Sequence, residues 1–310
     1  MSLFSSKPFT AESLGQGLAA QGYIASDNIA LTLFLAASLE KPILVEGPPG
    51  VGKTELAKAA SALFQRPLIR LQCYEGLDES KALYEWKYGK QLLYTQVLKE
   101  QLGDILRGAQ GLSESVERLH QFGDIFYSPE FLEPRPLLNA LQAESGAVLL
   151  IDEIDKADQE FEAFLLELLS DYQVSVPEIG TVHAKSTPLV LLTSNNQREL
   201  SDALKRRCLH LYIPYPDAVL ERRILSAQVP DLPEKLRTPL IDFVQALRRQ
   251  DLRKVPAISE TLDWARTLLL LHVDALDAAW VEKTLAVLLK HQDDVERIRD
   301  ELPVLLGRRR

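Results

Sequence analysis

The sequence predicts an α/β domain with a mainly parallel sheet, followed by an all-helical domain. Apolar runs of strand length alternate with helical patterns as far as Tyr215. Beyond that residue the pattern changes: no glycine occurs between Gly180 and Gly307, and four segments with helical spacing are punctuated by prolines at 230, 233, 239 and 256. We therefore expect two domains, an α/β core of residues 1–215 and a helical domain of residues 216–310.

The predicted strands share a short apolar run of the kind that is buried in parallel sheets. They span Pro42–Glu46, Pro67–Cys73, Ala147–Asp152, Pro188–Ser194 and Leu209–Pro214. The helices predicted for the second domain span residues 217–228, 234–250, 259–272 and 276–301. With 310 residues and 46% hydrophobic content, the chain can bury a core in each domain.

Composition and charge disfavour several classes of protein. The formal net charge of −9 disfavours a general nucleic-acid binder, so no nucleic-acid partner is expected. Cys73 and Cys208 lie far apart in apolar runs, which is typical of buried, reduced thiols. No apolar run is long enough to cross a bilayer, and the first residues lack a signal-peptide core. A cytoplasmic protein without membrane insertion is expected.

The stretch EGPPGVGKTE, residues 46–55, matches the phosphate-loop pattern G-x-x-x-x-G-K-[ST] and lies between a predicted strand and a predicted helix. Backbone N–H groups of such a loop and the helix N-terminus attract phosphate oxygens. Lys53 is expected to reach the β- and γ-phosphates, and the Thr54 hydroxyl to bind Mg²⁺. The predicted nucleotide-binding residues are Gly47, Pro48, Pro49, Gly50, Val51, Gly52, Lys53, Thr54 and Glu55. A GTPase is disfavoured because no N-K-x-D motif occurs.

Two neighbouring carboxylates follow the apolar strand Ala147–Asp152. Asp152 and Glu153 would lie at the carboxyl edge of the sheet, on the same side as the phosphate loop. Asp152 is predicted to hold Mg²⁺ together with Thr54, and Glu153 to activate the water that attacks the γ-phosphate. An acidic pair of this kind favours hydrolysis over phosphoryl transfer to a substrate.

In this order the motifs resemble the AAA+ ATPases and, within them, the MoxR family. The resemblance implies that Asn195, with Asn196 beside it, is the sensor 1 amide that contacts the γ-phosphate. It also implies that Arg207, with Arg206 as second choice, is an arginine finger that enters the ATP site of a neighbouring subunit. A ring-shaped homo-oligomer, expected to be a hexamer, follows from that role. The residue types alone fit equally well a basic helix end that faces its own dipole.

Two insertions support the MoxR resemblance. The 98 positions from Thr54 to Asp152 exceed a helix-strand-helix connection, so we place an insertion at about Gly89–Glu133, with the second helix unit resuming at Arg135–Gln142. A hairpin around a Pro-Glu-Ile-Gly turn is predicted at Val174–His183, before the sensor 1 strand. The implied fold is an AAA+ P-loop NTPase core with a helix-2 insertion and a pre-sensor-1 hairpin, followed by a helical lid domain.

Three shorter runs narrow the resemblance further: QCYEGLD (72–78), PEIGTV (177–182) and ALKRRC (203–208). They look like the CoxD-like branch, which is linked to maturation of carbon monoxide dehydrogenase and related molybdenum hydroxylases. This resemblance implies a chaperone with a metalloenzyme client and a partner that contains a von Willebrand factor A (VWA) domain. The alternatives are a DNA-remodelling AAA+ ATPase of clamp-loader or branch-migration type, weakened by the acidic charge, and a nucleotide-dependent scaffold with little turnover.

The sequence departs from the family at sensor 2, an arginine in a Ser-x-Arg arrangement at the start of a lid helix. Thr261 occupies that place. Another cation would have to substitute for it, either Arg266 or one of Arg222 and Arg223.

ATP and Mg²⁺ are expected to bind between the core and the lid. The segment Gly22-Tyr23-Ile24, ahead of the first strand, is a candidate for the adenine end of that pocket. Tyr23 and Ile24 would provide the contacts, and packing in the core is the alternative role for both.

Overall fold

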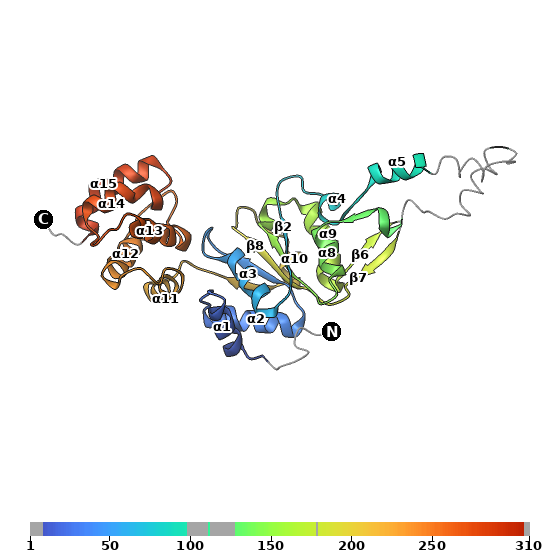
Figure 1. The fold of residues 1–310 in the computed structure, drawn as a ribbon, viewed down its shortest axis with the longest axis horizontal. Helices are drawn as coiled ribbons and strands as arrows, with labels where there is room; N and C mark the ends of the chain where they lie inside the picture. The colour runs from blue at the N-terminus through green and yellow to red at the C-terminus, as the bar shows by residue number, and fades with distance from the viewer. Residues whose placement is uncertain (1–8, 98–110, 112–127, 178, 307–310) are drawn as a thin grey trace.

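The computed structural model describes residues 9–97, 111, 128–177 and 179–306, in two parts (Figure 1). The described helices of the first part are α1 (Ala11–Ala20), α2 (Asp27–Leu39), α3 (Lys53–Phe64), α4 (Glu79–Ala82), α5 (Tyr88–Val97), α8 (Pro136–Gln142), α9 (Gln159–Asp171) and α10 (Asp202–Arg207), with short 3-10 turns η2 (Pro129–Phe131) and η3 (Ile154–Lys156). Its strands are β1 (Ile43–Glu46), β2 (Leu68–Gln72), β3 (Tyr84–Trp86), β4 (Leu132–Pro134), β5 (Val148–Asp152), β6 (Gln173–Val176), β7 (Gly180–His183), β8 (Leu189–Ser194) and β9 (Leu209–Tyr212).

Five strands form one parallel sheet in the order β2-β5-β8-β1-β9, which confirms the predicted α/β class. Each strand lies within the run predicted for it. β5 and β8 are buried along their whole length, as expected for strands covered on both faces. The register sets Glu46 beside Ser194 and Gln72 beside Asp152, so the carboxyl ends of the strands lie at one edge. That edge is where ligands bind in open α/β sheets.

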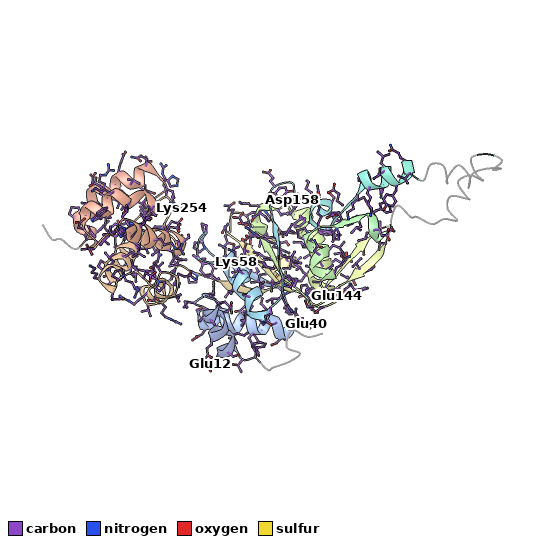
Figure 2. All side chains as sticks on the ribbon, viewed as in Figure 1. Glu12, Glu40, Lys58, Glu144, Asp158 and Lys254 are labelled. Carbon is purple, nitrogen blue, oxygen red and sulfur yellow. The ribbon has the colours of Figure 1, made fainter. Side chains whose placement is uncertain are left out.

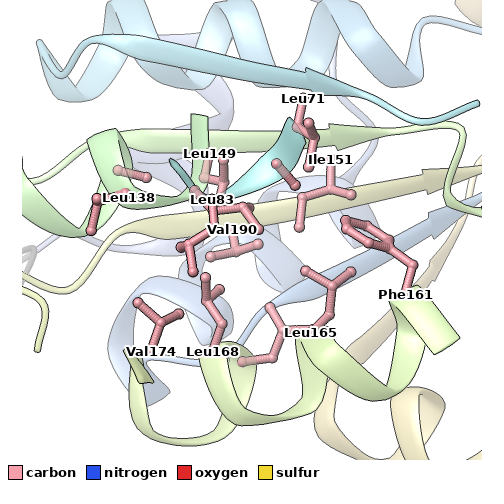
Figure 3. Packing of buried hydrophobic residues seen from close by; sticks show 14 of the residues in the cluster. Leu71, Leu83, Leu138, Leu149, Ile151, Phe161, Leu165, Leu168, Val174 and Val190 are labelled. Carbon is pink, nitrogen blue, oxygen red and sulfur yellow. The ribbon is translucent and has the colours of Figure 1, made fainter. Parts of the chain in front are cut away.

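Helices cover both faces of the sheet. Figure 3 shows one face, where side chains of β2, β5 and β8 such as Leu71, Ile151 and Val190 pack against Phe161 and Leu165 of α9. On the other face, α2 and α3 pack against strands of the sheet, and α1 packs on these two helices. Burial of each large apolar side chain contributes about 1.5–3 kcal/mol, so the strands that end in the candidate site are held in a rigid core.

Two small antiparallel ladders accompany the main sheet. β6 and β7 form the hairpin predicted at Val174–His183. β3 and β4 pair at the base of the predicted insertion. The insertion includes α5 at its start and β4 at its end, and residues 98–110 and 112–127 between them lie outside the described residues. The helix unit predicted to resume at Arg135–Gln142 is α8.

The second part is a helical domain at the opposite end of the molecule from α5 (Figure 1). It contains α11 (Ala218–Gln228), α12 (Glu234–Leu247), α13 (Ile258–Leu270), α14 (Ala278–Leu288) and α15 (Gln292–Leu305). The prediction of a single helix over 276–301 was wrong, because the chain is extended at Leu289. The break lets Leu288 and Leu289 both face the core, which neighbouring positions of a continuous helix do poorly.

Charged side chains such as Glu12, Lys58 and Glu144 lie on the outer surface (Figure 2). None of the described helices has the length and apolar character that a membrane span requires. Both cysteines are free thiols: Cys73 is buried, as predicted, whereas Cys208 is only half-buried.

Candidate active site

A cavity of about 550 Å³ lies between the carboxyl edge of the sheet and helices α11 and α13 of the helical domain. It brings together residues of every predicted catalytic motif that is expected to act within one chain. Its lining includes Pro49, Gly50, Val51, Gly52, Lys53, Thr54, Glu55, Asp152, Glu153 and Asn195. Gly47 and Pro48 do not line it. They contribute backbone carbonyls behind the loop.

The phosphate loop joins β1 to α3 and requires glycine at two positions of close approach. A Cβ atom on Gly47 would lie 2.2 Å from the carbonyl oxygen of Ile213, and one on Gly50 would lie 2.5 Å from the Ser259 Oγ. Both glycines also have positive φ angles, 148° and 79°. The loop therefore curls tightly between β9 and the first turn of α13, where the Ser259 N–H donates a 3.3 Å hydrogen bond to the Gly50 carbonyl.

Lys53 lies in the first turn of α3, with its ammonium group turned into the loop. Its Nζ donates to the carbonyl oxygens of Gly47 (2.6 Å) and Pro48 (2.8 Å) and to the Asn195 Oδ1 (2.7 Å). Burial lowers the pKa of Lys53, and three nearby carboxylates act in the opposite direction. The cation thus lies where the phosphate loop and the end of β8 meet.

Asp152 ends β5 and contacts three side chains through its buried carboxylate. The Thr54 hydroxyl donates to its two oxygens at 3.2 and 3.3 Å, and the Thr193 hydroxyl donates to Oδ1. Arg70 of β2 donates from Nε (3.0 Å) and from a terminal nitrogen (2.6 Å) to Oδ2. A hydroxyl and a carboxylate in contact are hard oxygen ligands suited to Mg²⁺, and this carboxylate already faces a cationic group. Thr54 and Asp152 therefore fit the metal predicted there.

Glu153 has a left-handed backbone conformation, with φ 58° and ψ 51°. Such a conformation costs a non-glycine residue about 1–3 kcal/mol, and the Thr193 hydroxyl secures it by accepting the Glu153 N–H at 2.8 Å. The Glu153 carboxylate accepts hydrogen bonds from Gln72 Nε2 (2.8 Å), Lys156 Nζ (2.7 Å) and Asn195 Nδ2 (3.3 Å). Held by three donors from separate elements, it can act as a positioned general base.

Asp155, to which no role was assigned from its sequence position, fixes the turn of the chain after β8. Its Oδ2 accepts the backbone N–H groups of Asn195 (3.0 Å) and Gln197 (2.9 Å). This places Asn195 in the cavity, whereas Asn196 does not line it. The signal in the sequence was a third acidic residue, two positions after Glu153.

Apolar side chains also line the cavity. Tyr23 and Ile24 line it together with Ile213, Leu220 and Ile224. Burial, and to a smaller extent the Glu55 carboxylate, raises the pKa of the Tyr23 phenol. Tyr23 also packs against the core cluster that contains β1, so its packing role is observed, while its contact with adenine stays a prediction.

Of the three arginines considered as substitutes for sensor 2, Arg266 alone lines the cavity. Its partner among the described residues is Asp263, at 3.3 Å. Arg222 instead forms an ion pair with Glu234 on the outer side of the helical domain. Thr261, at the expected sensor 2 place, is buried inside that domain and donates to the Glu221 carboxylate at 2.8 Å.

The two arginines at the end of α10 lie away from the cavity of their own chain. Arg207 donates from Nε to the Ser170 Oγ (2.6 Å) and from a terminal nitrogen to the Ala203 carbonyl (3.0 Å). Arg206 is exposed. The geometry within one chain fits both a finger that serves a neighbouring subunit and a basic helix end, so the role in trans stays a prediction.

The family profile described as "AAA domain (dynein-related subfamily)" matches residues 42–208. The chain belongs to this family. The matched residues include the phosphate loop, the Asp152-Glu153 pair, Asn195 and the α10 arginines. This AAA domain protein is therefore an ATP-hydrolysing enzyme that binds ATP with Mg²⁺.

Two similar proteins are named as uncharacterized, and the chain spans less than two thirds of the length of one of them. The uncharacterized protein YojN of Bacillus subtilis (strain 168) is 27% identical over 223 residues, which cover 69% of this chain and 62% of YojN. An uncharacterized protein of Staphylococcus haemolyticus is 27% identical over 80% of this chain and 83% of its own length. Among solved structures, a mutant of Thermotoga maritima RuvB aligns with a TM-score of 0.46 and 16% identity, covering 92% of this chain and 72% of the other.

Proposed function

We propose that this AAA domain protein is a MoxR-type chaperone of the cytoplasm, which assembles as a hexameric ring and uses ATP hydrolysis to remodel a protein client. The client class is a metalloenzyme that acquires its cofactor, in the manner of the CoxD-like branch, and a VWA-domain protein is the partner. The ATPase site drives this work, and the β6–β7 hairpin transmits it.

The position of the hairpin in the chain carries the proposal. β6 follows α9, which begins six residues after Glu153, and β7 leads through residues 184–188 into β8, which ends next to Asn195. The hairpin is thus inserted between the two segments that surround the terminal phosphate site. Its tip residue Ile179 has 36% of its surface exposed, and Glu178 beside it lies outside the described residues.

The contacts of the cavity side chains support the following proposed roles in ATP hydrolysis. Thr54 and Asp152 hold Mg²⁺, which neutralises charge on the phosphate oxygens when it is bound. Glu153 orients the attacking water and accepts its proton, and Asn195 donates to the terminal phosphate. Tyr23 and Ile24 contact the adenine.

The proposed partner has a metal-dependent site of its own, which can accept a carboxylate from this protein. The net charge of −9 supports such an acidic contact surface. Loss of the terminal phosphate would shift Asn195, then β8 and the hairpin, without any longer pathway.

The test begins with the ATP-trapped Glu153→Gln protein as bait. Proteins that co-purify with it in ATP but not in ADP are identified, and a VWA-domain protein and a metalloenzyme are expected among them. A variant with Glu178→Gly and Ile179→Ala is then compared with Val219→Ala, which truncates an exposed apolar residue of α11. The hairpin variant should keep basal hydrolysis and ring assembly but stop client maturation. Val219→Ala should allow client maturation.

Three outcomes would count against the proposal. Normal maturation with the hairpin variant would remove the hairpin from the mechanism. Several-fold stimulation of hydrolysis by single-stranded or duplex DNA would favour a DNA-remodelling ATPase. Tight ATP binding without measurable turnover would favour a scaffold.

A further inference from the structure

Arg70 forms an ion pair with Asp152, the carboxylate that is expected to bind Mg²⁺. It lies on β2, and its strand places Gln72 directly beside Asp152. The Arg70 side chain has 51% of its surface exposed, whereas that of Asp152 has 4%. A half-exposed cation therefore neutralises a buried acid, and it is free to move toward solvent while the acid is not.

The hydrogen bonds around Asp152 leave no acceptor position free. A carboxylate offers about four lone-pair positions. Two nitrogens of Arg70 donate to Oδ2, and the Thr193 hydroxyl donates to Oδ1. The Thr54 hydroxyl is shared between the two oxygens, at 3.2 and 3.3 Å. A hydrated Mg²⁺ that approaches from Thr54 needs one of these positions, either for itself or for one of its waters. The guanidinium is the group that can leave, because the two threonines are fixed by α3 and β8.

We propose that Arg70 is an exchangeable counter-ion of Asp152: it neutralises this carboxylate when no metal is bound and is displaced when Mg²⁺ enters with the nucleotide. Without Arg70 the nucleotide-free protein would bury an uncompensated charge, which is strongly unfavourable. When Arg70 is present, Mg²⁺ without nucleotide has to compete with a guanidinium that donates two hydrogen bonds to Asp152. Metal accompanied by phosphate oxygens brings further ligands and succeeds, so Arg70 makes metal loading depend on the nucleotide.

The decisive variant is Arg70→Gln, which removes the charge but keeps a hydrogen-bonding side chain of similar length. The first measurement is a Mg²⁺ titration at a fixed concentration of a fluorescent ATP analogue. The half-saturating Mg²⁺ concentration should fall by on the order of tenfold, since the competing state of Asp152 is removed. The second measurement is the thermal unfolding midpoint without nucleotide. Millimolar Mg²⁺ should raise it by about 2–5 °C in the variant and leave the parent unchanged.

Arg266→Gln is the matched control, because it removes a cation that lines the same cavity without contacting Asp152. It should weaken nucleotide binding without lowering the Mg²⁺ requirement. Arg70→Lys, which keeps the charge but loses the two-pronged contact, should give a smaller change of the same sign and carries the test if Arg70→Gln does not fold. An unchanged or increased Mg²⁺ requirement in the Arg70 variants, with no thermal response to the metal, would overturn the proposal.

Discussion

The Lys53 ammonium donates a 2.7 Å hydrogen bond to the side-chain oxygen of Asn195, a residue 142 positions away. One group follows the phosphate loop, and the other follows the strand beside it in the sheet. Both are expected to contact the terminal phosphate. We therefore expect nucleotide binding to break this hydrogen bond, which would couple the phosphate loop to the end of β8.

Glu153→Gln should bind ATP with Mg²⁺ and hydrolyse it very slowly, because the water-activating carboxylate is lost while the phosphate loop is intact. Lys53→Ala should instead lose nucleotide binding. Equilibrium binding of a fluorescent ATP analogue and phosphate release measure the two effects separately. Turnover of Glu153→Gln at the parent rate would show that this carboxylate is not the general base.

Arg207→Ala should be inactive alone and regain hydrolysis when mixed with inactive Lys53→Ala chains. Arginine fingers contribute about a thousandfold or more to turnover, and mixed rings pair an intact phosphate loop with an intact finger. Phosphate release is measured after demonstrated subunit exchange. Absence of recovery would count against the role in trans, and recovery restricted to Arg206 variants would move the finger by one residue.

Arg266→Ala should weaken ATP binding and hydrolysis by roughly tenfold, because it removes the cation that α13 presents to the cavity. Arg222→Ala is the control, since that arginine is paired with Glu234 outside the cavity. Nucleotide affinities and steady-state rates of the two variants distinguish the roles. Equal effects in both would remove Arg266 as a substitute for sensor 2.

Thr193→Val should lower both stability and turnover, because the lost hydroxyl bridges the Asp152 carboxylate and the Glu153 N–H. The Glu153 N–H is left without this acceptor and Asp152 loses one of its donors, which costs about 1–3 kcal/mol. Thr193→Ser retains the hydroxyl and should recover most of both properties. Denaturant unfolding and kcat are compared across the three proteins; a Val variant as active as the Ser variant would contradict this role.

Glu221→Ala should destabilise the helical domain by about 3–5 kcal/mol, because it leaves the guanidinium of Arg248 buried without its partner. The two side chains are joined at 2.7 Å, and Arg248 also holds the Pro216 carbonyl of the connection between the two parts. Asp274→Ala, which breaks the exposed pair with Lys235, is the control and should change stability by less than about 0.5 kcal/mol. Denaturant unfolding followed by fluorescence of the buried Trp264 reports on this domain.

The fold and the residues at strand ends were predictable because their signals are local. The central strands β1, β5 and β8 are mainly apolar runs, and the motif at the end of each follows within a few residues. Since carboxyl ends of parallel strands meet at one edge, Thr54, Asp152 and Asn195 could be expected close together before their contacts were known.

Arg70 and Thr193 were not predicted as site residues because they contact Asp152 from neighbouring strands. Arg70 reaches Asp152 over 82 positions, and Thr193 reaches it over 41. Both contacts depend on the strand order β2-β5-β8, which no local pattern specifies. The choice of Arg266 over Arg222 was open for the same reason, because helix packing, and not composition, decides which face of a lid helix meets the nucleotide cavity.

The hydrogen bond from Ser259 to the Gly50 carbonyl joins the helical domain to the phosphate loop. Ser259 lies at the start of α13, a helix of 13 residues whose far end is roughly 18 Å away at 1.5 Å per residue. A rotation of about 10° about that contact would carry Leu270 through about 3 Å. Any rotation of α13 about this hydrogen bond would therefore be small at the phosphate loop and largest at Leu270, at the far end of the helix.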